Sequence, residues 1–222
     1  MTLSPSVTEQ NKPFFVEKYF SQVVTAFGAT ALAALATYTA PTEAVRIIGM
    51  TVLTGVSYAT ANDMIACRDC PEYFTVGHFD DGQNLENRPI RTLNPTANAL
   101  VWGPLASWHV SLIAGTVLSL AARLPIFSAT VSANSLAPLL VTGAAVTFCI
   151  AHFAARKAES QRLGSFTVLG MNVGLYRGVR KEWQHGWHAC NTRNTVGYVA
   201  IGLGGAALAA GTIATRIALT IL

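Results

Sequence analysis

Long runs without charge decide what this chain can fold into. Four segments contain no Asp, Glu, Lys or Arg at all: residues 20–41, 92–122, 124–155 and 194–215. A helix needs about 20 mostly apolar residues to cross the hydrocarbon core of a bilayer, because each residue adds about 1.5 Å. A soluble protein interrupts such runs with charged surface positions. The chain is only 12% charged and 51% hydrophobic, so the sequence predicts an all-α integral membrane protein.

A fifth span is predicted from a shorter segment. Residues 47–62 are uncharged, but at about 1.5 Å each they cover only about 24 Å. They form either a fifth span or a short or re-entrant helix, which would leave four full spans. We expect a single membrane domain, residues 1–222, in which five helices lie near residues 19–40, 45–65, 95–121, 134–155 and 194–216.

The positions of Lys and Arg predict how the chain is threaded. Twelve of the 15 lie in the N-terminal segment and in the loops 66–94 and 156–193, which share one side of a five-helix bundle. The other side holds only Arg46, Arg123 and Arg216. Because positively charged loops stay in the cytoplasm, we expect a cytoplasmic N-terminus and a C-terminus on the opposite side. Anionic lipid at the cytoplasmic face then explains the net charge of +4, and we expect no nucleic-acid partner.

The last predicted helix is rich in small residues. Gly202, Ala206 and Ala210 follow one another at spacings of four, and Gly205 and Ala209 lie beside them. Small residues at this spacing let helix backbones approach closely in a membrane. Two interpretations stand: packing within the bundle, which we favour because the helices have to pack, or contact with a second copy or another membrane subunit.

Two cysteine and histidine stretches form the first candidate site. Cys67 and Cys70 are predicted to lie on the same side of the membrane as His185, His188 and Cys190. Sulfur and imidazole are the ligands that zinc prefers, and a C-x-x-C pair also suits thiol redox chemistry. The third interpretation, which we favour, is that these are reduced cysteines and a surface histidine in a reducing compartment.

A structural interpretation competes for the second of these stretches. Val179, Trp183, Trp187 and Cys190 fall on one stripe of a helix, and basic residues lie on another face. This pattern is typical of an amphipathic helix on the membrane surface, with Trp at the boundary between lipid and water. We therefore expect Trp183 and Trp187 to be interfacial.

Three ionisable side chains fall within the predicted spans: Asp63, His109 and His152. Such groups are costly in a bilayer, so each calls for a functional hypothesis or a polar partner on a neighbouring helix. His109 lies about 20 Å into its helix, whereas His152 lies near the end of its own. Because axial ligands of one haem need matching depths, haem is disfavoured.

No phosphate-binding loop, nucleophile elbow or dinucleotide fingerprint occurs in the sequence. We therefore expect a non-enzymatic membrane subunit or scaffold that associates through small-residue helix faces. The alternative is a channel or transporter for a small solute or metal ion that uses Asp63 and His109. A third hypothesis is a metal or thiol-redox protein at the cytoplasmic face.

Overall fold

The computed structural model describes residues 41–75, 90, 92–160, 166–168, 171–173 and 181–221. Among these residues, four helices are long and apolar enough to cross a membrane. They are α3 (Pro41–Asp69), α5 (Pro95–Arg123), α6 (Ala133–Ser160) and α7 (Gln184–Ile221). Shorter elements lie between them: α4 (Pro71–Thr75), the antiparallel strands β1 (Phe166–Val168) and β2 (Met171–Val173), and the 3-10 helix η3 (Lys181–Trp183).

The described chain is an all-α membrane bundle, as the sequence predicted. The helices expected near residues 95–121 and 134–155 correspond to α5 and α6. The helix expected near residues 19–40, and with it the fifth span, lies outside the described residues. At the start of α5 the Asn94 side chain accepts a hydrogen bond from the backbone N–H of Ala97 at 3.1 Å, and Pro95 follows as the first helical residue.

The second predicted helix is longer than expected. Helix α3 has 29 residues, a length of about 43 Å, so it is neither short nor re-entrant. The prediction relied on the charge-free stretch alone, whereas the helix continues through charged residues whose side chains are neutralised. At its first end Glu43 accepts a hydrogen bond from the backbone N–H of Ala133 at 2.8 Å, and Arg46 donates to Asn134 at 2.8 Å.

The last helix also begins earlier than expected. Helix α7 has 38 residues and starts at Gln184, ten residues before the predicted boundary at 194. The predicted boundary rested on Arg193, a charged residue expected in a loop. The structure instead buries Arg193 against Asp69, so the charge does not interrupt the helix. Residues 184–193 are therefore a continuation of the membrane helix.

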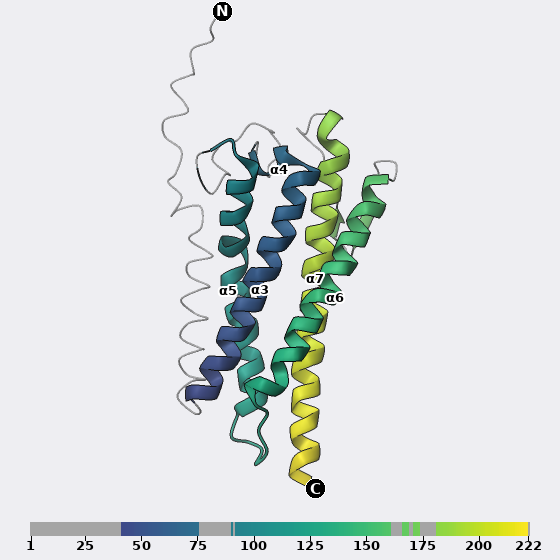
Figure 1. Cartoon of the computed structure of the whole chain (residues 1–222). Coiled ribbons are helices and arrows are strands. Elements are labelled where there is room, and N and C mark those ends of the chain that lie inside the picture. Colours follow the sequence, from purple (N-terminus) through teal and green to yellow (C-terminus); the bar gives the residue numbers. More distant parts are fainter. Residues whose placement is uncertain are drawn as a thin grey trace, which may run out of the picture.

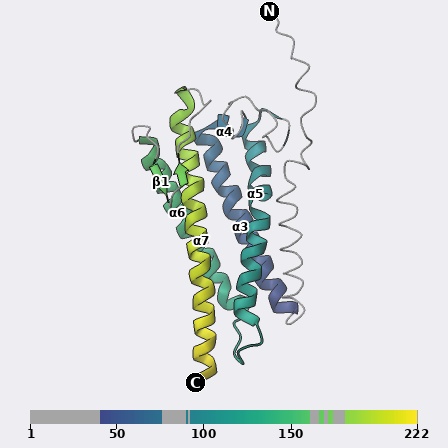
Figure 2. The same ribbon diagram turned by 180° about the vertical axis from the view of Figure 1, so that it is seen from behind.

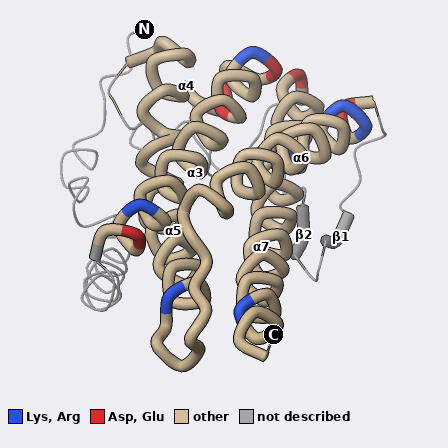
Figure 3. Tube along the Cα trace, turned by 60° about the horizontal axis from the view of Figure 1, so that its bottom comes forward, with Lys and Arg blue, Asp and Glu red and all other residues tan. Residues whose placement is uncertain are grey.

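The four long helices form two pairs. Helix α3 packs mainly on α5, and α6 packs mainly on α7, while no single contact between a helix of one pair and a helix of the other is as extensive (Figures 1 and 2). Both views place the C-terminus at the end of the bundle opposite α4. The charged residues of the long helices gather near their ends and leave the middle uncharged (Figure 3), as an apolar bilayer core requires.

Helices α3 and α5 approach closely because glycine lies at their contacts. A Cβ atom on Gly103 would come within 2.7 Å of the Cα atom of Thr60. A Cβ atom on Gly115 would come within 3.0 Å of the Cα atom of Ile48. Both neighbours are backbone atoms, so they move only if the helices move. This is the use of small residues that helix packing in membranes favours.

Arg216 closes the end of the bundle opposite α4. Its side chain is 1% exposed, and it donates hydrogen bonds to the carbonyl groups of Ala121, Leu124 and Ala129. The guanidinium also lies over the ring of Phe127, 5.0 Å from its centroid. Because carbonyl groups at the end of a helix carry partial negative charge, they stabilise this buried cation.

Substitution of Gly103 tests the close packing of α3 on α5. Gly103→Ala should lower the free energy of unfolding by about 1–3 kcal/mol, because the added methyl group meets the α3 backbone. Gly143→Ala is the matched control, since a Cβ atom there would meet nothing within 4 Å. The control should be neutral or stabilising by up to about 1 kcal/mol. Thermal unfolding in mild detergent measures both, and equal effects of the two substitutions would contradict the packing.

Candidate functional site at the α4 end of the bundle

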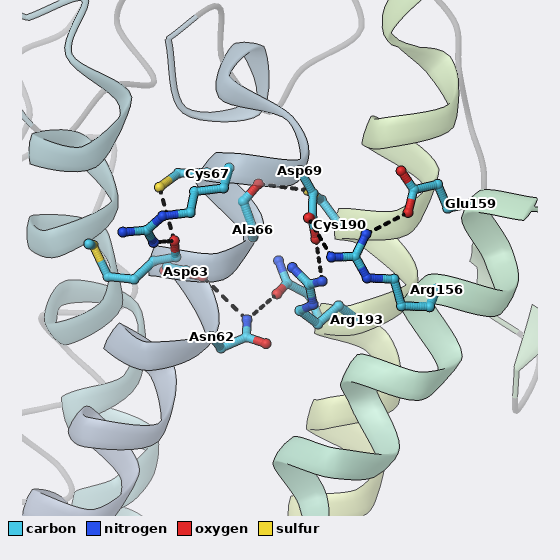
Figure 4. A network of polar contacts seen from close by, with 12 residues as sticks. Asn62, Asp63, Ala66, Cys67, Asp69, Arg156, Glu159, Cys190 and Arg193 are labelled. Atoms are coloured by element: carbon cyan, nitrogen blue, oxygen red, sulfur yellow. Dashed lines mark hydrogen bonds and ion pairs between the residues drawn. The ribbon is translucent and has the colours of Figure 1, made fainter.

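Buried polar side chains gather at one end of the bundle, where α3 ends, α4 follows and α7 begins (Figure 4). The end of α6 reaches the same region. Residues from three long helices therefore meet here, although more than a hundred positions separate some of them in the sequence. Figure 4 shows Asp69 of α3 between Arg193 of α7 and Arg156 of α6.

Asp69 is the centre of an ion network. One carboxylate oxygen accepts a hydrogen bond from Arg193, and the other lies 3.3 Å from a guanidinium nitrogen of Arg156. Arg156 also pairs with Glu159 at 3.0 Å. Arg193 is 1% exposed, and the side chain of Arg156 is 52% exposed. The two acids balance the two bases, so the buried Arg193 is compensated in charge. Removing one partner of such a buried pair is strongly destabilising.

A second set of hydrogen bonds links amide and phenol groups at the same end of the bundle. Asn62 donates to Asn194 at 2.9 Å, Asn194 donates to the Tyr73 hydroxyl at 3.2 Å, and that hydroxyl donates to Asn191 at 3.1 Å. The chain connects α3, α7 and α4. Burial raises the pKa of Tyr73 well above its usual value of 10.0, so the phenol stays neutral and can donate its hydrogen.

The two cysteine-containing stretches meet in space. Cys67, Cys70 and Cys190 are 3%, 2% and 0% exposed and belong to one buried cluster. Trp187 lies in the same cluster, 3% exposed, with its ring centroid 4.9 Å from that of Tyr73. Trp183 is partly buried and packs against the cluster. Trp187 therefore faces the interior of the bundle, not the lipid boundary that the amphipathic pattern predicted.

The three thiols of this cluster each donate to an oxygen atom. Cys67 donates to the carbonyl of Met64 at 3.3 Å, Cys70 to the carboxylate of Glu72 at 3.6 Å, and Cys190 to the carbonyl of Ala66 at 3.5 Å. Such contacts require protonated thiols, whereas metal ligands are thiolates.

The histidines of the predicted zinc set are divided between two environments. His185 is exposed and His188 is 1% exposed. The described residues include no group of three or more His, Cys, Asp or Glu side chains placed to hold a metal ion. Zinc binding therefore stays a prediction without geometric support.

The three ionisable residues of the predicted spans do not converge. Asp63 is 6% exposed and lines a polar cavity between α3, α5 and α7. His109, 9% exposed, lies on α5 with its ring against Trp108 and does not line this cavity. His152 of α6 stacks on Phe148 with a centroid distance of 6.5 Å. A joint role of Asp63 and His109 in one pathway has no support from this arrangement.

The small residues of α7 face outward. Gly202, Gly205, Ala206 and Ala210 are exposed, and Ala209 is partly buried. A Cβ atom on Gly202 or Gly205 would meet nothing within 4 Å. The favoured interpretation, packing of this face within the bundle, is therefore not what the described part of the chain shows. We call this set of five residues the small-residue face.

Comparison with known proteins returned no match: no protein-family model, no curated protein and no solved structure resembles the chain. The function has to be inferred from the geometry of the chain itself.

Replacing Tyr73 tests the neutral phenol at the centre of the amide chain. Tyr73→Phe should lower the free energy of unfolding by about 1 kcal/mol at pH 7, because Asn191 and Asn194 lose a partner. The folded-state pKa lies above the unfolded value of about 10. The stability that this shift contributes is therefore present below pH ~10 and is lost as the pH rises through the raised value.

The variant should consequently lose less stability than the unsubstituted chain between about pH 9 and pH 11. Unfolding in mild detergent across this range measures the difference. An identical alkaline loss in the two proteins would contradict a buried, neutral Tyr73.

Proposed function

We propose that this chain is a non-enzymatic, multi-pass membrane subunit that associates with a further transmembrane helix through the small-residue face of α7. The observation that carries the proposal is the open space at Gly202 and Gly205. In a bilayer, lipid tails are as apolar as leucine, so hydrophobicity does not drive helix association. Close packing does, and residues without bulky side chains permit it.

The surface next to this face has the same character. A groove of about 350 Å³ runs between α3, α6 and α7, and Gly143, Gly204 and Gly205 are among the residues that line it. A Cβ atom on any of the three would meet nothing within 4 Å. Gly205 belongs both to the groove and to the small-residue face, so the two form one continuous surface in which glycine positions leave open space. Such a surface is better suited to packing against another helix than to exposure to solvent.

The partner in the simplest arrangement is a second copy of the chain. Small-residue contacts are often self-complementary, because the same face of two identical helices meets across a twofold axis. We further propose that the α4 end of the bundle faces the cytoplasm. Arg68, Arg156, Lys157 and Arg193 lie toward that end of their helices, and positive charge accumulates on the cytoplasmic side.

The two alternative functions find less support in the geometry. A transport pathway through both Asp63 and His109 would need them to share a cavity, and only Asp63 lines the polar one. Thiol chemistry would need accessible sulfur, whereas Cys67, Cys70 and Cys190 are each at most 3% exposed.

Disulfide cross-linking in membranes tests the association. Gly202→Cys, made in a Cys149→Ser background because Cys149 is the exposed native cysteine, should form a species of twice the 23.5 kDa chain mass with copper phenanthroline. Ala207→Cys is the matched control. It is also a small, exposed position, but it lies about 140° around the helix from Gly202, and it should cross-link much less.

Gly202→Ile should abolish the association in mild detergent, because the branched side chain prevents close approach. Equal cross-linking at positions 202 and 207, or none at either, would contradict the proposal.

A further inference from the structure

A cavity of about 80 Å³ with several polar side chains in its wall lies between α3, α5 and α7. The residues that give it its character are two amides, one carboxylate and three aromatic side chains: Asn62, Asn194, Asp63, Tyr58, Trp102 and Tyr198. It is separate from the ion network, since neither Asp69 nor Arg193 lines it. The association through α7 leaves this cavity without a role.

Among the described residues that line the cavity, Asp63 is the only acid. Its carboxylate accepts a hydrogen bond from the side chain of Asn62 at 3.4 Å, and among the described residues it forms no ion pair. The nearby bases Arg193 and Arg156 are balanced by Asp69 and Glu159. Asp63 is therefore a buried acid for which the described residues provide no ion-pair partner.

An uncompensated carboxylate in an apolar segment is costly. This free-energy cost is avoided when the acid is protonated or when a cation binds to the carboxylate. A divalent cation needs several oxygen ligands and usually more than one carboxylate, and this cavity offers a single acid. A monovalent cation satisfies the charge.

The aromatic side chains select among monovalent cations. Tyr58, Trp102 and Tyr198 line the same space as the carboxylate. The buried hydroxyl of Tyr58 has no hydrogen-bond partner within the described part of the chain. Aromatic rings attract cations that carry alkyl groups, such as organic ammonium ions. A carboxylate beside aromatic rings is thus suited to an N–H donor that also has an apolar part.

The volume limits the size of this ligand. A cavity of about 80 Å³ suits a ligand of a few non-hydrogen atoms, such as methylammonium or dimethylammonium. Val110 and Tyr198 also line the cavity and are 47% and 61% exposed. The cavity therefore opens sideways between α5 and α7.

We propose that this cavity is a binding site for a small alkylammonium group, which pairs with Asp63 and contacts the aromatic walls. The ammonium group is supplied either by a free ion or by the headgroup of an ethanolamine lipid, since both present the same chemistry. The site is independent of the association proposed above.

Isothermal titration calorimetry on the full-length chain in mild detergent tests the site. Methylammonium chloride should bind saturably, while sodium chloride at equal ionic strength should not, and tetramethylammonium should bind at least about tenfold more weakly because it has no N–H to donate to the carboxylate. Asp63→Asn, which preserves the shape of the side chain, should weaken methylammonium binding about 30-fold or more. Circular dichroism confirms that the variant is folded.

Three matched variants separate the contributions of the Asp63 charge, the Tyr58 ring and the Tyr58 hydroxyl to methylammonium affinity. Glu159→Gln, an acid outside the cavity, should leave the affinity unchanged. Tyr58→Phe keeps the ring and should lower the affinity less than Tyr58→Leu, which removes it. Competition by phosphatidylethanolamine in nanodiscs would assign the site to a lipid headgroup, and its absence would assign it to a free ion. Failure of methylammonium to bind, or equal binding by Asp63→Asn, would overturn the proposal.

Discussion

The carboxylate of Asp69 lies between two guanidinium groups, that of Arg193 on α7 and that of Arg156 on α6. Each long helix contacts its own partner more extensively than it contacts either helix of the other pair, and the ion pairs of Asp69 add to the contacts that arrange the two pairs. Asp69 bridges both helices of the second pair from the end of the first. Because Arg193 is buried, its charge is tolerated only while this acid is present.

This pairing also places the other features of the α4 end. It allows α7 to remain helical through a charged residue, and it sets Trp187 and Cys190 against Cys67 and Cys70. On the next turn of α7, Asn194 joins the amide chain and lines the cavity that Asp63 shares. The outward side of the same helix carries the small-residue face. One helix thus contributes to the bridge, to the proposed ligand site and to the proposed association.

Hydropathy and charge-free runs were sufficient to predict the membrane helices, because the bilayer imposes its thickness on each. They misplaced the starts of α3 and α7, since both helices include charges that are neutralised by residues far away in sequence. Asp69 and Arg193 each lie at the edge of an apolar run, but nothing local indicates that they pair. The spacing of small residues predicted the small-residue face that includes Gly202. It did not predict whether this face points into the bundle or outward. Tyr58 and Asn194 belong to no recognisable sequence motif, so the cavity that they line could not be predicted from the sequence.

The central claim is that the pair of Asp69 and Arg193 holds the two helix pairs together. A double-mutant cycle with Asp69→Asn, Arg193→Gln and the double variant, read from unfolding in mild detergent, tests it most directly. We expect each single substitution to cost about 3 kcal/mol or more. The double variant should then be no less stable than the less stable of the two single variants, which gives a coupling of about 3 kcal/mol or more. Effects that add within about 0.5 kcal/mol would contradict the claim.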